Sequence, residues 1–269
     1  MEARAVRGVF LAIASLWASS VPASGADRSL TGPGSVVEGK ERGEPKVFHV
    51  VAKVEIGPTG DITRVIPDLA LGREVGGAVE RAVRALSFTP ATVDDKPAAG
   101  TTFVRMMGCA VPLEQDGFRL AFAYTSHGPG YSKLPHPTYP AAALRIGATG
   151  HFEVQVTLQP DGTARMDQVR VIEGGARAEK TFAESIKAWV AELRYEPEMV
   201  AGKAVPTSMS IPLEFGMGPF SRKAWRAEQK ALRDQQVQSD ACQVAFGRER
   251  TRPSKSVALN SPFLLKEGG

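Results

Sequence analysis

The chain has 269 residues, of which 43% are hydrophobic, 23% charged and 7% aromatic. This composition is that of a soluble globular protein with one large or two small domains, and it excludes collagen-like, prion-like and wholly disordered chains. No uninterrupted apolar run reaches about 18 residues, which excludes a polytopic membrane protein. The formal charge is +4, and its surplus lies near the C-terminus, where residues 217–255 hold nine basic and four acidic side chains.

An export signal is predicted for residues 1–26. Charged residues near the start precede the apolar run GVFLAIASLW, and small residues follow it up to Ala26. This order is typical of a cleavable secretory signal, so the mature chain is expected in the periplasm. An uncleaved N-terminus anchored in the inner membrane and facing the periplasm is the alternative. Residues 27–45, rich in glycine and charge, are expected to form a flexible linker.

Two stretches, residues 46–112 and 134–216, begin with the same pattern. Apolar residues alternate from Phe48 to Ile56, which predicts a strand, and a turn rich in glycine and proline leads into a second strand. Shifted by 102 positions, Phe152 to Leu158 repeats the strand, and a Pro-Asp-Gly turn follows it. The same hairpin is therefore predicted twice.

Each stretch continues with a helix and a last strand. Val75 to Leu86 carries apolar residues at helical spacing, and Phe182 to Leu193 repeats that spacing 107 positions later. Alternation in Thr102–Met106 and Met209–Leu213 predicts the last strands. The sequence thus predicts an α+β fold of two tandem ββαβ units, each with one helix packed on a small antiparallel sheet.

The segment between the two stretches, residues 113–133, is predicted to be a connecting strand and loop. Apolar residues alternate from Phe118 to Tyr124, and we expect this strand to lead the second unit. Residues 128–140 are rich in proline and are expected to be extended. Pro140 then begins a short helix, Ala141–Ile146, which Gly147 ends.

Several short motifs occur in a characteristic order within residues 134–216. They are Tyr139-Pro140-Ala141-Ala142, Gly150, Pro160-Asp161-Gly162, Trp189, Tyr195-Glu196-Pro197, Gly202-Lys203 and Ile211-Pro212-Leu213-Glu214-Phe215. In this order they resemble the C-terminal domain of the energy transducer TonB. Residues 46–112 resemble a second, degenerate copy that lacks the leading Tyr-Pro helix.

The resemblance implies a periplasmic protein that binds a short extended peptide of an outer-membrane transporter by adding that peptide as a strand to its sheet edge. The sequence contains no spanner of Pro-Glu and Pro-Lys repeats, so peptide or protein binding is the part of that activity we expect here. Neither a nucleic acid nor a small-molecule substrate is expected as a partner. The alternative is a structural envelope protein whose two repeats pack on each other and leave no peptide-binding edge.

The last predicted strand is the candidate partner-binding edge, because two prolines bracket it and proline cannot donate to a β-ladder. Its residues are Pro206, Thr207, Ser208, Met209, Ser210, Ile211, Pro212, Leu213, Glu214 and Phe215. An exposed edge can accept a guest strand through its backbone N–H and C=O groups. The other interpretation is that the two prolines only prevent aggregation.

Catalytic and metal-binding patterns are not found. The four histidines have no zinc-ligand spacing, and no phosphate-binding loop or nucleophile motif opens a helix, so neither an enzyme nor a cofactor is predicted. Cys109 and Cys242 are predicted to form a disulfide in an oxidising compartment, with two free buried thiols as the alternative. Residues 217–269 form a basic tail with a predicted helix at Ser221–Gln238, either simply solvated or attracted to an anionic partner.

Overall fold

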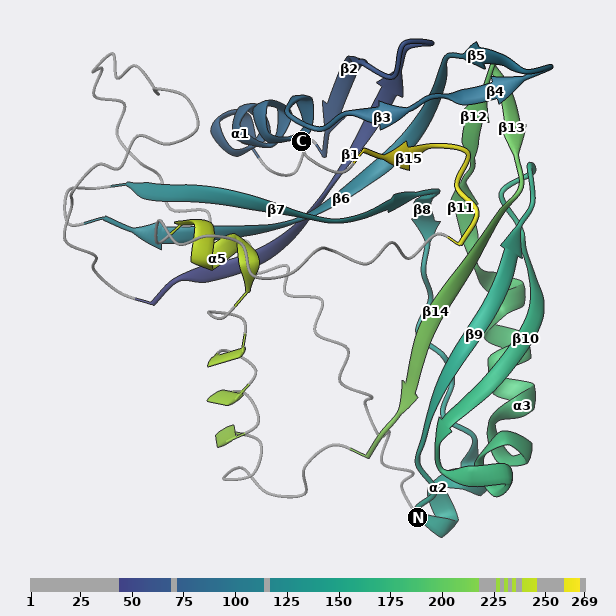
Figure 1. Cartoon of the computed structure of the whole chain (residues 1–269). Coiled ribbons are helices and arrows are strands. Elements are labelled where there is room, and N and C mark those ends of the chain that lie inside the picture. The colour runs from purple at the N-terminus through teal and green to yellow at the C-terminus, as the bar shows by residue number, and fades with distance from the viewer. Residues whose placement is uncertain are drawn as a thin grey trace.

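The structure, a computed structural model, describes residues 44–68, 72–113, 117–217, 226–227, 230–231, 234–235, 239–245 and 259–266. The predicted export signal and all but the last two residues of the predicted linker lie outside these residues, as does most of the predicted tail helix 221–238. The described chain combines helices with antiparallel sheets, in agreement with the predicted α+β class (Figure 1).

The larger sheet has six strands, in the order β13-β12-β6-β1-β2, with β7 also paired to β6. Its strands are β1 (Lys46–Ile56), β2 (Ile62–Pro67), β6 (Gly100–Pro112), β7 (Phe118–Gly128), β12 (Glu198–Val200) and β13 (Lys203–Val205). We call residues 46–112 the N-terminal unit and residues 134–216 the C-terminal unit. The sheet therefore draws strands from both units.

Helix α1 (Gly72–Arg84) covers one face of this sheet. Of the β1 residues that were predicted to face inward, those from Val50 to Ile56 are buried, with Val54 fully inaccessible to solvent, and Phe48 is partly buried. Val79 and Val83 of α1 are also inaccessible. Three short strands follow the helix: β3 (Phe88–Thr89), β4 (Ala91–Val93) and β5 (Lys96–Ala98). The apolar alternation and the helical spacing read from the sequence thus meet in one core.

The prediction that the strand after residue 113 leads the C-terminal unit is wrong. This strand, β7, pairs antiparallel with β6 from Phe103↔Gly128 to Pro112↔Phe118. The Leu113 N–H donates to the Gly117 carbonyl (3.1 Å), beside the ends of the two strands. Neighbouring strands in sequence pair readily, and here the hairpin buries Phe122 in the N-terminal core.

The C-terminal unit has a three-stranded sheet in the order β10-β9-β14. Its elements are α2 (Ala141–Ile146), β9 (Gly150–Leu158), β10 (Ala164–Glu173), α3 (Gly175–Glu192), β11 (Arg194–Glu196) and β14 (Thr207–Phe215), and β8 (Gly130–Lys133) immediately precedes the unit. Helix α3 packs on β9 and β10, while β8 pairs with β11. The short helix α2 has the predicted bounds, and Gly147 ends it in the left-handed conformation.

The two hairpin turns hold the chain in the same way in both units. Gly60 and Gly162 have φ values of +88° and +84°. A Cβ added to Gly60 would lie 2.0 Å from the carbonyl oxygen of Phe88, and one added to Gly162 would lie 2.5 Å from that of Tyr195. The Phe88 N–H donates to Gly60 (3.1 Å), and the Tyr195 N–H donates to Gly162 (2.8 Å). Only glycine fits this approach, which ties each turn to the strand after the helix.

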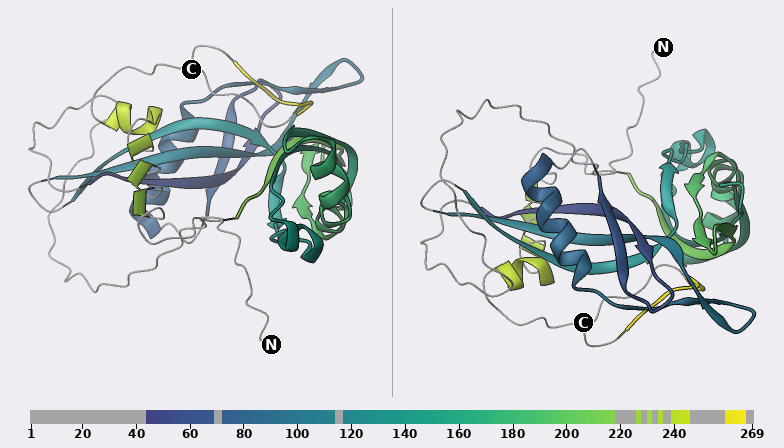
Figure 2. Two further views of the ribbon diagram at one scale, coloured as in Figure 1. Left: turned by 90° about the horizontal axis from the view of Figure 1, so that it is seen from below. Right: turned by 90° about the horizontal axis from the view of Figure 1, so that it is seen from above.

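The two units meet along the start of β6, and Figure 2 shows the C-terminal unit at one end of the long N-terminal strands. Hairpin β12–β13 of the C-terminal unit extends the N-terminal sheet, with Met199 opposite Thr101. Lys53 forms an ion pair with Glu196, and the Arg105 guanidinium lies 4.6 Å from the centroid of the Tyr131 ring. The contact between the units is therefore a shared sheet with polar and aromatic contacts beside it.

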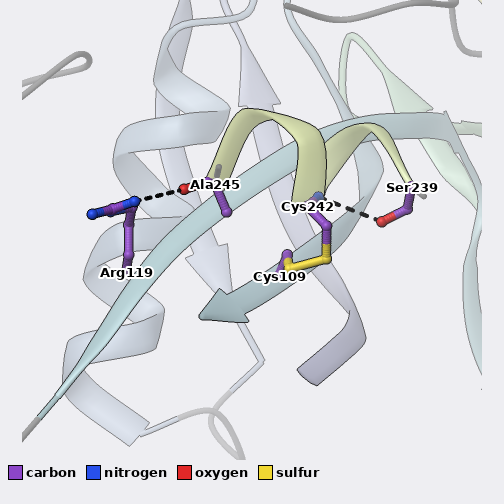
Figure 3. The surroundings of a disulfide bond; sticks show 5 residues. All are labelled: Cys109, Arg119, Ser239, Cys242 and Ala245. Carbon is purple, nitrogen blue, oxygen red and sulfur yellow. Dashed lines mark hydrogen bonds between the residues drawn. A yellow bond between two sulfur atoms is a disulfide. The ribbon is translucent and has the colours of Figure 1, made fainter. Parts of the chain in front are cut away.

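The predicted disulfide is confirmed. Cys109 on β6 and Cys242 on helix α5 (Asp240–Ala245) are bonded and fully buried (Figure 3). Around them Val111 and Ala121 form an apolar cluster on the sheet face opposite α1, because their positions alternate with those that face α1. The bond therefore fastens α5 of the C-terminal tail to the N-terminal unit.

The last described segment, residues 259–266, also returns to the N-terminal unit. Its strand β15 (Leu264–Leu265) pairs with β3, and the Phe263 side chain is fully buried in the N-terminal core. Of the helices in the described part of the chain, none has the length and apolar character needed to cross a membrane.

Candidate partner-binding edge

The predicted edge strand is present as β14, at one side of the C-terminal sheet. It pairs with β9 in unbroken antiparallel register over nine residues, from Thr207↔Leu158 to Phe215↔Gly150. None of the strands that the structure describes pairs with its other side. Pro206, included in the predicted edge, lies just before the strand and is exposed.

Alternating burial fixes the orientation of β14. Thr207, Met209, Leu213 and Phe215 are at most 2% exposed and face the core beneath α3, whereas Pro212 and Glu214 are exposed on the other face. Phe215 stacks on Phe182 of α3, with 4.3 Å between the ring centroids. This packing fixes the strand in place, and no strand in the described part of the chain pairs with its outer side.

The backbone groups of alternate residues point away from the sheet. The Ser208 N–H donates to the Asn260 Oδ1 atom, and the Ser208 carbonyl accepts from the Leu259 N–H, so both groups of Ser208 point away from β9. Because alternate residues of a strand share this direction, Ser210, Pro212 and Glu214 also direct their backbone groups outward. The missing N–H of Pro212 would point outward, so the proline costs the sheet no hydrogen bond to β9.

The opposite edge of the same sheet has a different character. Strand β10 pairs with β9 through two register shifts, one between Met166 and Gln168 and one between Val171 and Glu173. Such bulges twist an edge and disrupt the regular spacing of its free groups, which discourages further strand pairing. Of the two edges, only that of β14 has regular geometry.

Polar side chains surround the exposed face of β14. Glu153 of β9 accepts a hydrogen bond from the Ser210 Oγ atom (2.6 Å) and another from the Arg170 Nε atom (2.8 Å). The Ser210 bond, followed by the Arg170 bond, holds the pKa of the Glu153 carboxyl below its usual value. The Glu153 charge is thus compensated within the sheet, and the nearby Glu214 side chain is exposed.

The N-terminal unit has a strand in the same position, but its edge is filled. Strand β6 follows a helix and pairs antiparallel with β1, as β14 follows α3 and pairs with β9. On its other side, β6 pairs with β12 at Thr101 and with β7 from Phe103 onward. Among the described strands, β14 therefore has no neighbour on its outer side, whereas the corresponding side of β6 is paired with β12 and β7 (Figure 1).

Sequence reasoning did not identify three residues beside this edge. Glu198 is fully buried, and its carboxylate accepts hydrogen bonds from the hydroxyls of Thr102, Thr207 and Ser261. Asn260 bonds to Ser208 of β14, and the buried His127 bonds to the carbonyl of Phe263, three residues after Asn260. A glutamate in a three-residue strand carries no periodic signal, so only the fold reveals its burial.

The C-terminal unit is thus a helix-backed, three-stranded antiparallel domain with one regular open edge. Residues 135–217 match the family model described as the Gram-negative bacterial TonB protein C-terminal. Protein TonB of Yersinia enterocolitica is 35% identical over 85 residues, which cover 32% of this chain and 31% of that protein. The C-terminal unit is therefore a domain of the TonB C-terminal family, and the N-terminal unit lies outside the matched residues.

Proposed function

We propose that the chain is a periplasmic binding protein that holds an extended segment of a partner protein as an added strand along β14. The family of the C-terminal unit favours an outer-membrane transporter as that partner and energy-coupled transport as the process served. The buried disulfide supports a location in an oxidising compartment such as the periplasm. The role is one of binding rather than catalysis.

The regular, unpaired edge of β14 carries this proposal. From Ser210 to Phe215 the strand pairs with β9 without a register shift, and its outward backbone groups have no partner strand among the described residues. Adding a strand needs such a row of donors and acceptors and no special side chain. Within its own sheet β14 is the better acceptor, because β10 is bulged, and the corresponding strand of the N-terminal unit, β6, is already paired on both sides.

The edge also defines what a guest strand must provide. Ser210 and Glu214 offer an outward N–H and C=O each, and Pro212 offers a C=O alone, so the guest must place acceptors opposite the first two. Each hydrogen bond contributes about 0.5–1.5 kcal/mol net. On the core side the guest meets the half-buried Ile211, and on the other side it meets Ser210 and Glu214. A guest with alternating apolar and polar side chains fits both faces.

We also propose that residues 46–112 are a degenerate second copy of the C-terminal unit whose edge no longer binds guests. The hairpin β4–β5 corresponds to β12–β13 at a constant offset of 107 positions, and the glycine contacts of the two turns are alike. The shared sheet between the units is the observation that favours the alternative, a structural envelope protein. That alternative requires the β14 edge to be covered in the isolated chain.

Blocking the outward N–H of Ser210 tests the binding role. We expect Ser210→Pro to weaken guest binding at least about tenfold, because the guest carbonyl opposite it loses its donor. Pro212 already occupies an equivalent outward position in β14, so the strand accepts proline there. The guest is a peptide selected from a displayed random library on the purified, disulfide-bonded chain, and its affinity is measured by calorimetry.

Ser210→Ala is the matched control. It removes the hydroxyl that donates to Glu153 but keeps the backbone N–H, so it should bind the peptide like the wild type. Equal melting temperatures of the two variants confirm that both are folded. The proposal fails if Ser210→Pro binds every selected peptide as tightly as the wild type, or if no peptide is selected.

A further inference from the structure

The start of the β14 edge, at Ser208, is occupied by the chain's own C-terminal segment. The Ser208 N–H lies 2.5 Å from the Asn260 Oδ1 atom, and the Leu259 N–H donates to the Ser208 carbonyl at 2.9 Å. These contacts take up both outward groups of Ser208, which a longer guest strand would otherwise use. We call Leu259–Asn260 the cap.

The residues that follow the cap are firmly held by the N-terminal unit. The Phe263 ring is fully buried and packs against Gly100. A Cβ added to Gly100 would lie 2.4 Å from the Cζ atom of this ring. The His127 Nε2 atom donates to the Phe263 carbonyl (2.7 Å), and the Lys266 N–H donates to Ser87 (3.0 Å). Burial lowers the pKa of His127, and the bond to the Phe263 carbonyl acts in the opposite direction, since it favours the protonated ring.

The cap itself is weakly held. Leu259 is 57% exposed, Asn260 is exposed, and neither residue belongs to a strand. One of the two bonds to Ser208 comes from a side chain rather than from a backbone ladder. The firm contacts begin at Ser261, whose hydroxyl donates to the buried Glu198 carboxylate at 2.8 Å. The segment therefore has a fixed part and a short part that can open alone.

The corresponding position in the N-terminal unit is closed more strongly. Thr101 of β6 lies 107 positions before Ser208, and its neighbour across the edge is Met199 of the β12–β13 hairpin. The Ala201 N–H adds a bond to the Ala99 carbonyl at 2.8 Å. A regular strand thus covers the start of β6, whereas among the described residues two residues outside any strand cover the start of β14.

We propose that the cap is a displaceable part of the chain that competes with the end of a guest strand for Ser208. This inference rests on the proposed binding of a guest along β14. A short guest occupies Ser210–Phe215 and leaves the cap in place. A guest that extends to Ser208 displaces Leu259 and Asn260, while Phe263 remains anchored. The cap therefore discriminates between guests by length and reduces the affinity for the longer ones.

Removing the two hydrogen bonds between the cap and Ser208 tests this competition. The double variant Leu259→Pro/Asn260→Ala removes the N–H and the amide oxygen that bond Ser208. We expect it to bind a peptide that reaches Ser208 about tenfold more tightly than the wild type does, and a peptide that ends at Ser210 with unchanged affinity. Leu264→Ala is the control: it changes an exposed side chain in the same segment, away from β14, and should alter neither affinity.

An unchanged affinity for the longer peptide, or an equal gain for both peptides, would overturn the competition. Hydrogen exchange of the free wild-type chain tests the cap without any guest. The Ser208 amide should exchange at least about a hundredfold faster than the Lys266 amide, because the cap opens locally. Exchange of both amides at the same rate would also overturn the proposal. If no peptide binds, the proposed function fails, and this exchange experiment still decides whether the cap opens.

Discussion

Replacing Phe182 with alanine is expected to lower the free energy of unfolding by about 4 kcal/mol, because it leaves a cavity at the centre of the C-terminal core. The Phe182 ring is fully buried and contacts three other rings: Tyr139 (5.5 Å between centroids), Phe152 (5.6 Å) and Phe215 (4.3 Å). Phe215 is the last residue of β14, so guest binding should weaken together with stability. Urea unfolding followed by circular dichroism measures the loss.

Lys187→Ala is the matched control for this variant, since Lys187 lies on the exposed face of the same helix. It should change the free energy of unfolding by less than about 0.5 kcal/mol. If Phe182→Ala were as stable as this control, the aromatic cluster would not be the core of the C-terminal unit, and the placement of β14 on it would be wrong.

Removing the disulfide is the second change with a large expected effect. The bond joins residues separated by 133 positions. Closing so long a loop lowers the conformational entropy of the unfolded chain, which ideally stabilises the folded state by about 5 kcal/mol. We expect the double variant Cys109→Ala/Cys242→Ala to lose about 3–5 kcal/mol, with alanine chosen because both sites are fully buried. Thermal unfolding of the double variant and of the wild type measures this loss.

Guest binding gives this experiment an internal control. The disulfide joins the tail to the N-terminal unit, and α5 contacts β6 and β7, so the folded double variant should bind a selected peptide like the wild type. Mass measurement of the wild type before and after reduction should show the gain of two protons. Two free thiols in the unreduced chain, or an unchanged melting temperature of the variant, would contradict the assigned role of the bond.

The strands and helices with strong periodic patterns could be predicted from the sequence. Strand β1, the hairpin β9–β10 and helix α2 follow directly from alternation and from the positions of proline and glycine. The last strand was placed correctly as well, except that Pro206 precedes it. These elements are local, because each is determined by residues that are adjacent in sequence.

What the sequence did not reveal were the long-range pairings. The alternation in β7 predicts a strand, but it does not specify whether that strand pairs with β6 or with the following unit. Phe263 is one aromatic residue in a short segment, and only the fold shows that its ring fills the space left by Gly100. The cap at Ser208 depends on the same return of the chain, so the full extent of the open edge was not predictable.

Hydrogen exchange of β14 in the isolated chain is the most direct test of the open edge. The amides of Ile211 and Leu213 point toward β9 and should be strongly protected, whereas those of Ser210 and Glu214 should exchange close to the rate of an unfolded peptide and become protected when a selected peptide is added. Equal protection of all four amides in the free chain would contradict the open edge and would favour the structural role.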